Sequence, residues 1–181
     1  MRDQIVQIIY EGTNDIQEGE VLRVIAQTRG ESLTFLLNMI LRYIGDPHDD
    51  MFVNCVDDYL RIAVDRCYSI SAKFFGDMQS SDPLKKQMPL LYAHNFVCIL
   101  GHTIMAWMLC SIADEAAREL RARHPKFSEE QLDQFDLNSD EVFYWNKIQA
   151  VILFCKRILS QVQGLYDPID KSDVSALKFR I

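Results

Sequence analysis

The chain has 181 residues, of which 49% are hydrophobic and 25% are charged, a composition that suits one folded domain with a substantial core and argues against disorder. Its net charge of -7 and pI near 5.0 oppose the basic surface that nucleic-acid-binding proteins need, so we expect no nucleic-acid partner.

Helical periodicity runs through most of the chain, and almost nothing has the pattern of a strand. The sequence therefore predicts an all-α fold. The first long helix is expected over 31–44, where polar residues form a single narrow stripe: Glu31, Thr34, Asn38 and Arg42. Such a pattern is typical of a helix that is buried on most of its circumference.

A second helix is expected to begin at Asp46-Pro47, an N-cap residue followed by proline at the first helical position. Asp49 and Asp50 would then lie at the positive end of the helix dipole. Steps of three and four predict its core-facing stripe: Phe52, Val56, Tyr59, Ala63, Cys67, Ile70 and Phe74. Residues 76–82 predict a polar turn.

Asp82-Pro83 repeats the cap-and-proline signal before a long segment that reaches about Arg123. Because an interior proline removes a hydrogen bond, the regular helix is expected to begin or kink near Pro89. Residues 88–113 are apolar enough to raise the question of a membrane span. Polar groups interrupt them, however, so a helix buried among other helices is the prediction, with no membrane span.

Asn138 and Glu141 have the spacing of a capping box, which predicts the start of a last long helix. Its apolar seam is expected at Trp145, Ile148, Ile152, Cys155, Leu159 and Val162. The helix should end before Gly164 and Pro168, and residues 165–181 are expected to form a tail. Short connections and two seams of this kind favour an up-down bundle of about four long helices, preceded by a short helix-loop-helix.

The five cysteines lie singly in apolar helical patterns, without a Cys-x-x-Cys pair: Cys55, Cys67, Cys98, Cys110 and Cys155. This arrangement predicts buried, reduced thiols. The start of the chain also lacks the pattern of a secretory leader, so a cytoplasmic location is the expectation.

The segment 9–17, Ile-Tyr-Glu-Gly-Thr-Asn-Asp-Ile-Gln, resembles the catalytic loop of flavin-dependent acyl-CoA dehydrogenases. Arg2-Asp3 and Arg23 also match positions where that family commonly has these residues. The resemblance covers about the first 25 to 30 residues, which makes it more specific than a lone tetrapeptide. Ile5, where the family often has a basic residue, and Gly19, which weakens a helix start, depart from it.

The resemblance implies that Glu11 is the general base that removes the α-proton of an acyl-CoA, while the β-hydrogen leaves as hydride to FAD. Gly12, Thr13 and Gln17 match positions next to the flavin. A carboxylate needs a dry, apolar pocket for this work, and in the family most of that pocket comes from domains before the loop. We therefore expect the chain alone not to be catalytic. The alternative is an exposed turn in which Thr13 or Asn14 caps the next helix.

Residues 1–29 would then be the end of a dehydrogenase-like catalytic domain, and residues 30–181 a C-terminal helical extension. The stretch 142–148 looks similar to a late helix of the extension that some of these enzymes carry. In the family such extensions support subunit contacts, which implies a homo-oligomer or the missing dehydrogenase domains as partners. The second hypothesis is a stand-alone helical module for interaction or assembly that retains a relic of the loop.

His94 and His102, with Cys98 between them, could share one helix face and suggest a metal site. Facing Glu-x-x-His pairs and closely paired zinc ligands are missing from the sequence, so helix-packing histidines are the expectation and no metal site is predicted.

Overall fold

The computed structural model describes residues 14–125 and 138–178, and every regular element in these two ranges is helical. The elements are α2 (Asn14–Gln27), α3 (Glu31–Gly45), α4 (Val53–Cys55), the π-helical turn η1 (Val56–Leu60), α5 (Arg61–Gln79), α6 (Pro83–Leu91), α7 (Ala93–Arg123), α8 (Ser139–Arg157), η3 (Leu159–Gln161), α9 (Val162–Asp170) and η4 (Ser175–Lys178). The predicted all-α fold is confirmed.

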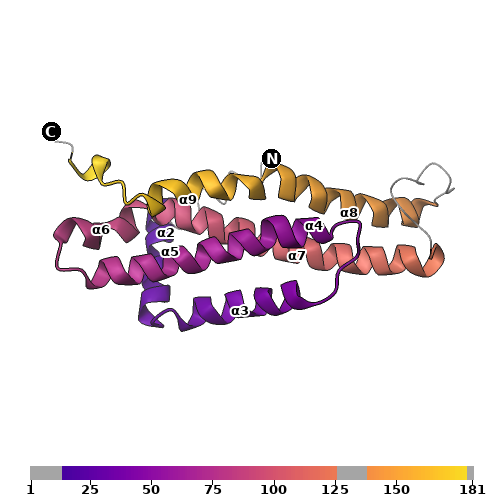
Figure 1. Cartoon of the computed structure of the whole chain (residues 1–181), viewed down its shortest axis with the longest axis horizontal. Helices are drawn as coiled ribbons and strands as arrows, with labels where there is room; N and C mark the ends of the chain where they lie inside the picture. The colour runs from indigo at the N-terminus through magenta and orange to yellow at the C-terminus, as the bar shows by residue number, and fades with distance from the viewer. Residues whose placement is uncertain (1–13, 126–137, 179–181) are drawn as a thin grey trace.

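Four long helical segments run side by side in alternating directions (Figure 1). In chain order they are α3, α4 with α5, α7, and α8 with α9. This is the predicted up-down bundle. Helix α2 crosses it near the end where α6 and α9 lie, and both views show α2 standing out from the long axis. The short N-terminal helix is therefore a transverse element that touches α3, α6 and α7.

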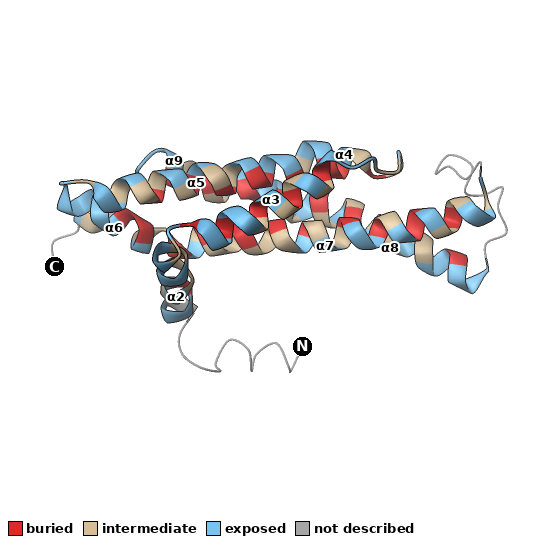
Figure 2. Cartoon of the chain, turned by 90° about the horizontal axis from the view of Figure 1, so that it is seen from below, coloured by how far each residue is buried: buried red, intermediate tan, exposed pale blue. Residues whose placement is uncertain are grey.

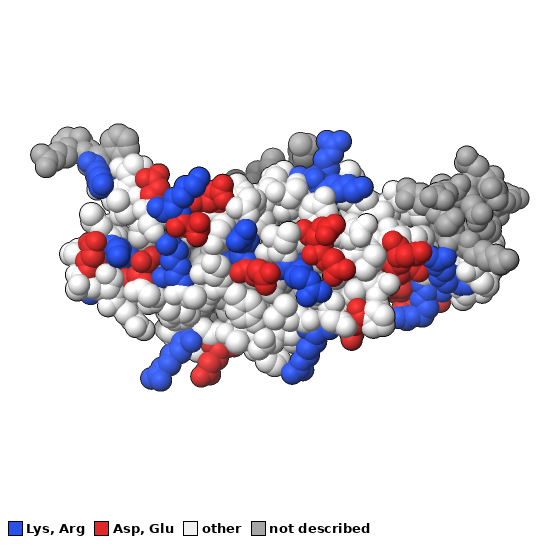
Figure 3. Space-filling view, in the orientation of Figure 1, with Lys and Arg blue, Asp and Glu red and all other residues white. Residues whose placement is uncertain are grey.

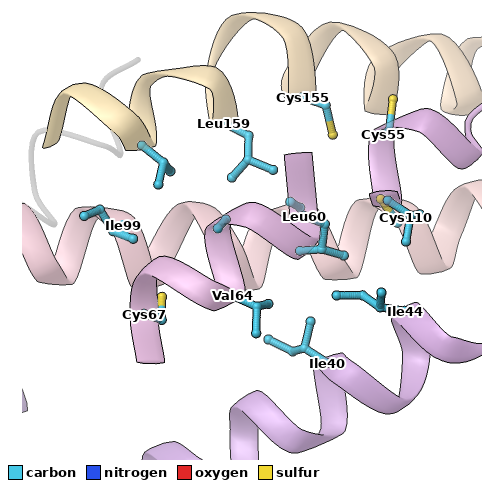
Figure 4. Packing of buried hydrophobic residues seen from close by; sticks show 14 of the residues in the cluster. Ile40, Ile44, Cys55, Leu60, Val64, Cys67, Ile99, Cys110, Cys155 and Leu159 are labelled. Atoms are coloured by element: carbon cyan, nitrogen blue, oxygen red, sulfur yellow. The ribbon is translucent and has the colours of Figure 1, made fainter. Parts of the chain in front are cut away.

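Buried side chains from all four layers meet along the bundle axis, and Figure 2 shows the buried residues facing inward between the helices. In Figure 4, Ile40 of α3 points toward Val64 of α5, and Leu60 lies between them and Leu159. The predicted stripe of the second helix is in this core, although Tyr59 is only partly buried. The stripe is placed correctly because spacing of three and four holds one helix face toward the core.

The predicted helix start at Asp46-Pro47 is wrong. Asp46 is the extended C-cap of α3, and the next helix begins only at Val53. Asp49 organises that start instead: its side chain accepts a hydrogen bond from the amide of Met51 at 3.1 Å, and its carbonyl accepts from Val53 at 3.0 Å. The connection between α3 and α4 contacts α7, for example through Asp49 and Arg121, and these contacts outweigh the local tendency of Asp46-Pro47 to start a helix.

The predicted turn at 76–82 is shorter than expected, because α5 continues through Gly76 to Gln79. The cap at Asp82 is confirmed, since its carboxylate accepts a hydrogen bond from the amide of Leu84 at 2.9 Å. Pro89 lies inside α6, and the helix breaks at Tyr92 just before α7. The regular long helix thus begins close to Pro89, as predicted.

The capping box at Asn138 and Glu141 is confirmed. The predicted tail at 165–181 is wrong, because after the 3-10 turn η3 the chain continues as α9 through Gly164 to Asp170. Tyr166 is held against α5, where its hydroxyl lies 2.9 Å from Ser69 Oγ. Burial of Tyr166 and Ile169 stabilises a segment whose sequence carries no clear period.

The expectation that α3 is buried on most of its circumference is also wrong. One side of α3 lies in the core, whereas Phe35 is 67% exposed and six further residues of the helix are exposed as well. The bundle covers α3 chiefly through α5, and among the described residues no helix lies over its outer side.

Helix α7 is long and apolar enough to cross a bilayer by length and composition alone, and a third of its most apolar stretch is buried within the bundle. It packs along α5, α8 and α9. Its outward side carries three exposed apolar residues at helical spacing: Met105, Met108 and Ile112.

Candidate functional site

Glu11, Gly12 and Thr13, the predicted base and two of the predicted flavin-contact residues, lie outside the described residues. Gln17 is described and is exposed in the first half of α2. The structure therefore positions the helix that follows the loop, and the geometry of the candidate site is built from α2 and the helices beneath it.

Helix α2 is held on the bundle by its inner face, where Leu22 and Ile25 pack against the core. On its outer face, Arg23 Nε lies 2.8 Å from both carboxylate oxygens of Glu20. The hydrogen bond from Arg23 lowers the pKa of Glu20, and the hydrogen bond to Glu20 raises the pKa of Arg23. Both groups are exposed, so this pair orients side chains without adding much stability.

Gln17 lines an open, apolar groove of about 340 Å³ between α2, the start of α3 and α7. The other lining residues are Glu20, Val21, Val24, Ile25, Ser32, Leu33, Leu36 and Leu100. Most of its walls are aliphatic. One wall of a ligand site can be of this kind, because apolar lining with a few polar groups is typical of cofactor sites.

Glu18 is buried, unlike most glutamates on a surface helix: the residue is only 8% exposed. Its Oε1 lies 2.6 Å from Nδ1 of His94, near the start of α7. The other ring nitrogen of His94, Nε2, lies 3.5 Å from Sγ of Cys98 one turn along α7. A carboxylate, an imidazole and a thiol thus form a continuous hydrogen-bonded row.

The sequence predicted only part of this row. Helical spacing placed His94 and Cys98 on one face of α7, and that proximity is confirmed. His102 does not join them: its ring meets the edge of Phe154 on α8 with centroids 6.4 Å apart, and burial lowers its pKa. Glu18 was missed, because a residue 76 positions away from His94 leaves no local signal.

Burial, and next the nearby charge of Glu18, raise the pKa of the Cys98 thiol. The resting form of the row is therefore a neutral thiol beside the imidazole. Within residues 14–125 and 138–178, no group of three or more His, Cys, Asp or Glu side chains is arranged to hold a metal ion.

The prediction of buried cysteines is confirmed for four of the five, and Cys98 is only partly buried. Three of the buried cysteines meet in the core. Figure 4 shows Cys55 and Cys155 close together, with Cys110 below them on α7. Hydrogen bonding to Cys110 is the largest influence on Cys155 and raises its pKa to about 12. Because the thiolate is the reactive form, these buried thiols are chemically quiet packing groups.

Charges of both signs alternate over the face shown in Figure 3, where Lys and Arg side chains lie next to Asp and Glu. No single-sign patch is visible on that face. A surface of this kind lacks the field that would concentrate a polyanion there.

The family comparison covers the part of the bundle that follows α3, and neither α3 nor the loop is included. A family model described as acetyl-CoA dehydrogenase C-terminal like matches residues 49–180, from the connection before α4 to two residues beyond η4. The match includes the stretch 142–148, which the sequence had linked to such an extension. A comparison with curated protein sequences returned no match. Because the family model covers well over half of the chain, the chain belongs to the acetyl-CoA dehydrogenase C-terminal-like family.

Proposed function

We propose that this chain is the C-terminal part of an FAD-dependent acyl-CoA dehydrogenase, an enzyme of fatty acid metabolism that desaturates an acyl-CoA between its α- and β-carbons. The observation that carries the proposal is the family match over 49–180, in a chain whose residues 9–17 resemble the catalytic loop of these enzymes. Residues 1–29 would complete the catalytic domain and residues 30–181 would form the extension.

The burial of α3 supports this division. Leu33, Leu37 and Ile40 belong to the same hydrophobic core as the residues of α5 and α7, although α3 precedes the matched region. Helix α2 differs, because it crosses the bundle and keeps one face exposed. A short transverse helix with an open face suits a connection between two domains.

The described residues fit FAD as one wall of a shared cleft. Gln17 is exposed at the groove between α2, α3 and α7, whose aliphatic lining would exclude water from one side of a flat ligand. The groove is open on its other side, so a second polypeptide surface would have to close it. When bound, the flavin would accept the β-hydrogen of the substrate as hydride.

Glu11 would remove the α-proton in the same reaction. A carboxylate becomes a useful base near neutral pH only when a dry environment raises its pKa, and the domains that precede the loop in the family provide that environment. The proposal therefore includes an inactive isolated chain.

The free thiols of all five cysteines are the form found in a reducing compartment, which supports a cytoplasmic setting.

The test joins this chain to the dehydrogenase domains expected in the coding region upstream of Met1. We expect the joined protein to bind FAD and to reduce a dye with acyl-CoA as the donor, and the chain alone to do neither. Glu11→Gln should lower the turnover of the joined protein about 10²- to 10⁴-fold at unchanged flavin content, the range of a lost general base. Glu115→Gln, at an exposed position of α7 outside the groove, is the matched control and should keep the activity. Full activity of the Glu11→Gln protein would refute the assignment of the base.

A second candidate, a stand-alone assembly module, is favoured by the exposed apolar residues of α7 and α3. The residues Met105, Met108 and Phe35 are each more than half exposed. Exposed apolar side chains of this size are typical of a surface that another protein molecule covers. If the module self-associates, light scattering will show a dimer that Met108→Glu converts to a monomer. An unrelated gene upstream of Met1, together with such a dimer, would favour this candidate over the dehydrogenase.

A further inference from the structure

The row Glu18, His94 and Cys98 is the one hydrogen-bonded chain of acid, base and nucleophile that the described residues present at the surface. The His94 side chain is 64% exposed, and Cys98 is partly exposed on the same face of α7. The Glu18 side chain is 11% exposed and lies behind the imidazole. A reagent from solvent can therefore reach the thiol and the imidazole, while the carboxylate is sheltered.

Glu18 determines which nitrogen of His94 carries the proton. An ionised carboxylate only accepts hydrogen bonds, so at 2.6 Å it selects the tautomer with hydrogen on Nδ1. The lone pair of the neutral ring is then on Nε2, which faces Sγ of Cys98 at 3.5 Å. Since sulfur is a large atom, this distance permits a hydrogen bond from the thiol to the imidazole.

A neutral thiol beside a base of this tautomer suits one kind of chemistry in particular. The thiol can attack an electrophilic carbonyl while the imidazole takes its proton, and the same proton can then pass to the leaving group. The raised pKa of Cys98 agrees with this order of events, because the proton stays on sulfur until the attack. The four remaining cysteines are buried and have no histidine hydrogen-bonded to sulfur among the described contacts.

We propose that Cys98 accepts an acyl group from an acyl-CoA thioester, with His94 as general base and Glu18 as the residue that positions the imidazole. The choice of a thioester as donor rests on the function proposed above. The Sγ–carbon bond forms as the bond between the carbonyl carbon and the CoA sulfur breaks. The thiol proton moves to Nε2 and then to the CoA sulfur, so the products are acyl-Cys98 and free CoA, and no oxidation or reduction takes place.

The experiment uses the purified chain and octanoyl-CoA, with the adduct followed by intact mass and located by peptide mapping. We expect one octanoyl group on Cys98, release of one equivalent of CoA, and loss of the adduct in neutral hydroxylamine, which cleaves thioesters and spares acylated lysine. Cys98→Ser should abolish the hydroxylamine-sensitive adduct. Absence of the adduct from the wild-type chain, or its presence on the buried cysteines instead, would overturn the proposal.

Histidine variants separate base catalysis from simple exposure of the thiol. His94→Gln should slow acylation about tenfold or more, in keeping with the loss of a general base. His102→Gln is the matched control, because His102 lies four residues from Cys98 in the opposite direction along α7 and packs against Phe154. Equal rates for His94→Gln and the wild type would contradict the proposal.

Glu18 variants test positioning. Glu18→Gln keeps an acceptor oxygen for Nδ1 and should retain most of the rate, whereas Glu18→Leu should lose about as much as His94→Gln. Thermal unfolding of each variant checks that α2 is still folded on the bundle. If Glu18→Leu unfolds, Glu18→Ala takes its place, and a full acylation rate in a folded variant without an acceptor at residue 18 would overturn the positioning role. Flavin plays no part in these measurements, so their outcome is independent of whether the joined dehydrogenase is active.

Discussion

His48, in the loop between α3 and α4, lies with Nδ1 3.1 Å from the carboxylate of Asp114 in the second half of α7. The other ring nitrogen lies 2.9 Å from the carbonyl oxygen of Tyr43, and the Tyr43 hydroxyl donates to Asp114 as well. The imidazole therefore bridges two hydrogen-bond acceptors, the carboxylate of Asp114 and the carbonyl oxygen of Tyr43. Its side chain is only 3% exposed, and the network ties the loop to α7.

His48→Ala should therefore destabilise the fold by about 1–3 kcal/mol, because the partly buried Asp114 would lose one of its donors. Urea unfolding measures the change. Arg118→Ala is the matched control one turn along α7, since Arg118 pairs with Glu115 in solvent. The control should change the free energy of unfolding by less than about 0.5 kcal/mol. Equal effects of the two substitutions would show that the His48 network is not stabilising.

The same loop makes a second connection to α7 through Arg121, whose Nε lies 2.9 Å from Asp49 Oδ2. Burial acts to raise the pKa of Asp49, but hydrogen bonds from Arg121 and from the amide of Met51 outweigh it and lower the pKa below the usual 3.8. A carboxyl with a lowered pKa stabilises the folded state above its unfolded pKa, and that stabilisation is lost as the pH falls through the lower folded value.

Asp49→Asn should consequently be less stable than the wild type at pH 7, and the difference should shrink as the pH falls below about 4. Chemical unfolding at several pH values measures this convergence. Asp57→Asn is the control, because Asp57 pairs with Arg61 in solvent and should show a small difference throughout. A difference for Asp49→Asn that stays constant down to pH 2 would contradict the role of the charge.

Gly30, between α2 and α3, has φ of +80°, and a Cβ there would lie 2.8 Å from the Phe75 ring. Gly30→Ala should cost about 1–2 kcal/mol from the left-handed backbone alone, with the steric contact adding to it. Gly19→Ala is the matched opposite case: Gly19 lies inside α2, and a Cβ there meets no heavy atom within 4 Å. It should stabilise the protein by about 0.5–1 kcal/mol. Thermal melts measure both variants. If Gly30→Ala and Gly19→Ala shift the melting temperature in the same direction, the positive φ of Gly30 is not the deciding factor.

The start of α8 depends on Asn138, whose side chain accepts hydrogen bonds from the amides of Asp140 at 3.0 Å and Glu141 at 3.1 Å. Asn138→Ala should lower the free energy of unfolding by about 1 kcal/mol, the usual value of an N-cap. Ser139→Ala, at the next and exposed position, should have little effect. The comparison of melting temperatures is the measurement, and an unchanged Asn138→Ala protein would exclude the cap as a source of stability.

The sequence by itself determined the helical class, the core stripe of α5 and the caps at Asp82 and Asn138. These features depend on residues within one or two turns of each other, so their signals survive in the linear order. It also placed His94 beside Cys98 for the same reason. The loop at Glu11 stays a prediction, because residues 1–13 are not described and the family match begins at residue 49.

Only the tertiary structure decided where α4 begins, that α9 continues through Gly164, and that Glu18 meets His94. Each of these depends on partners far apart in the chain: Asp49 with Arg121, Tyr166 with Ser69, and Glu18 with a residue on another helix. Local propensities differ by about 1 kcal/mol or less per residue for most amino acids, so one buried contact between helices can outweigh them. Such contacts form only when packing brings the helices together, and no window along the sequence contains both partners.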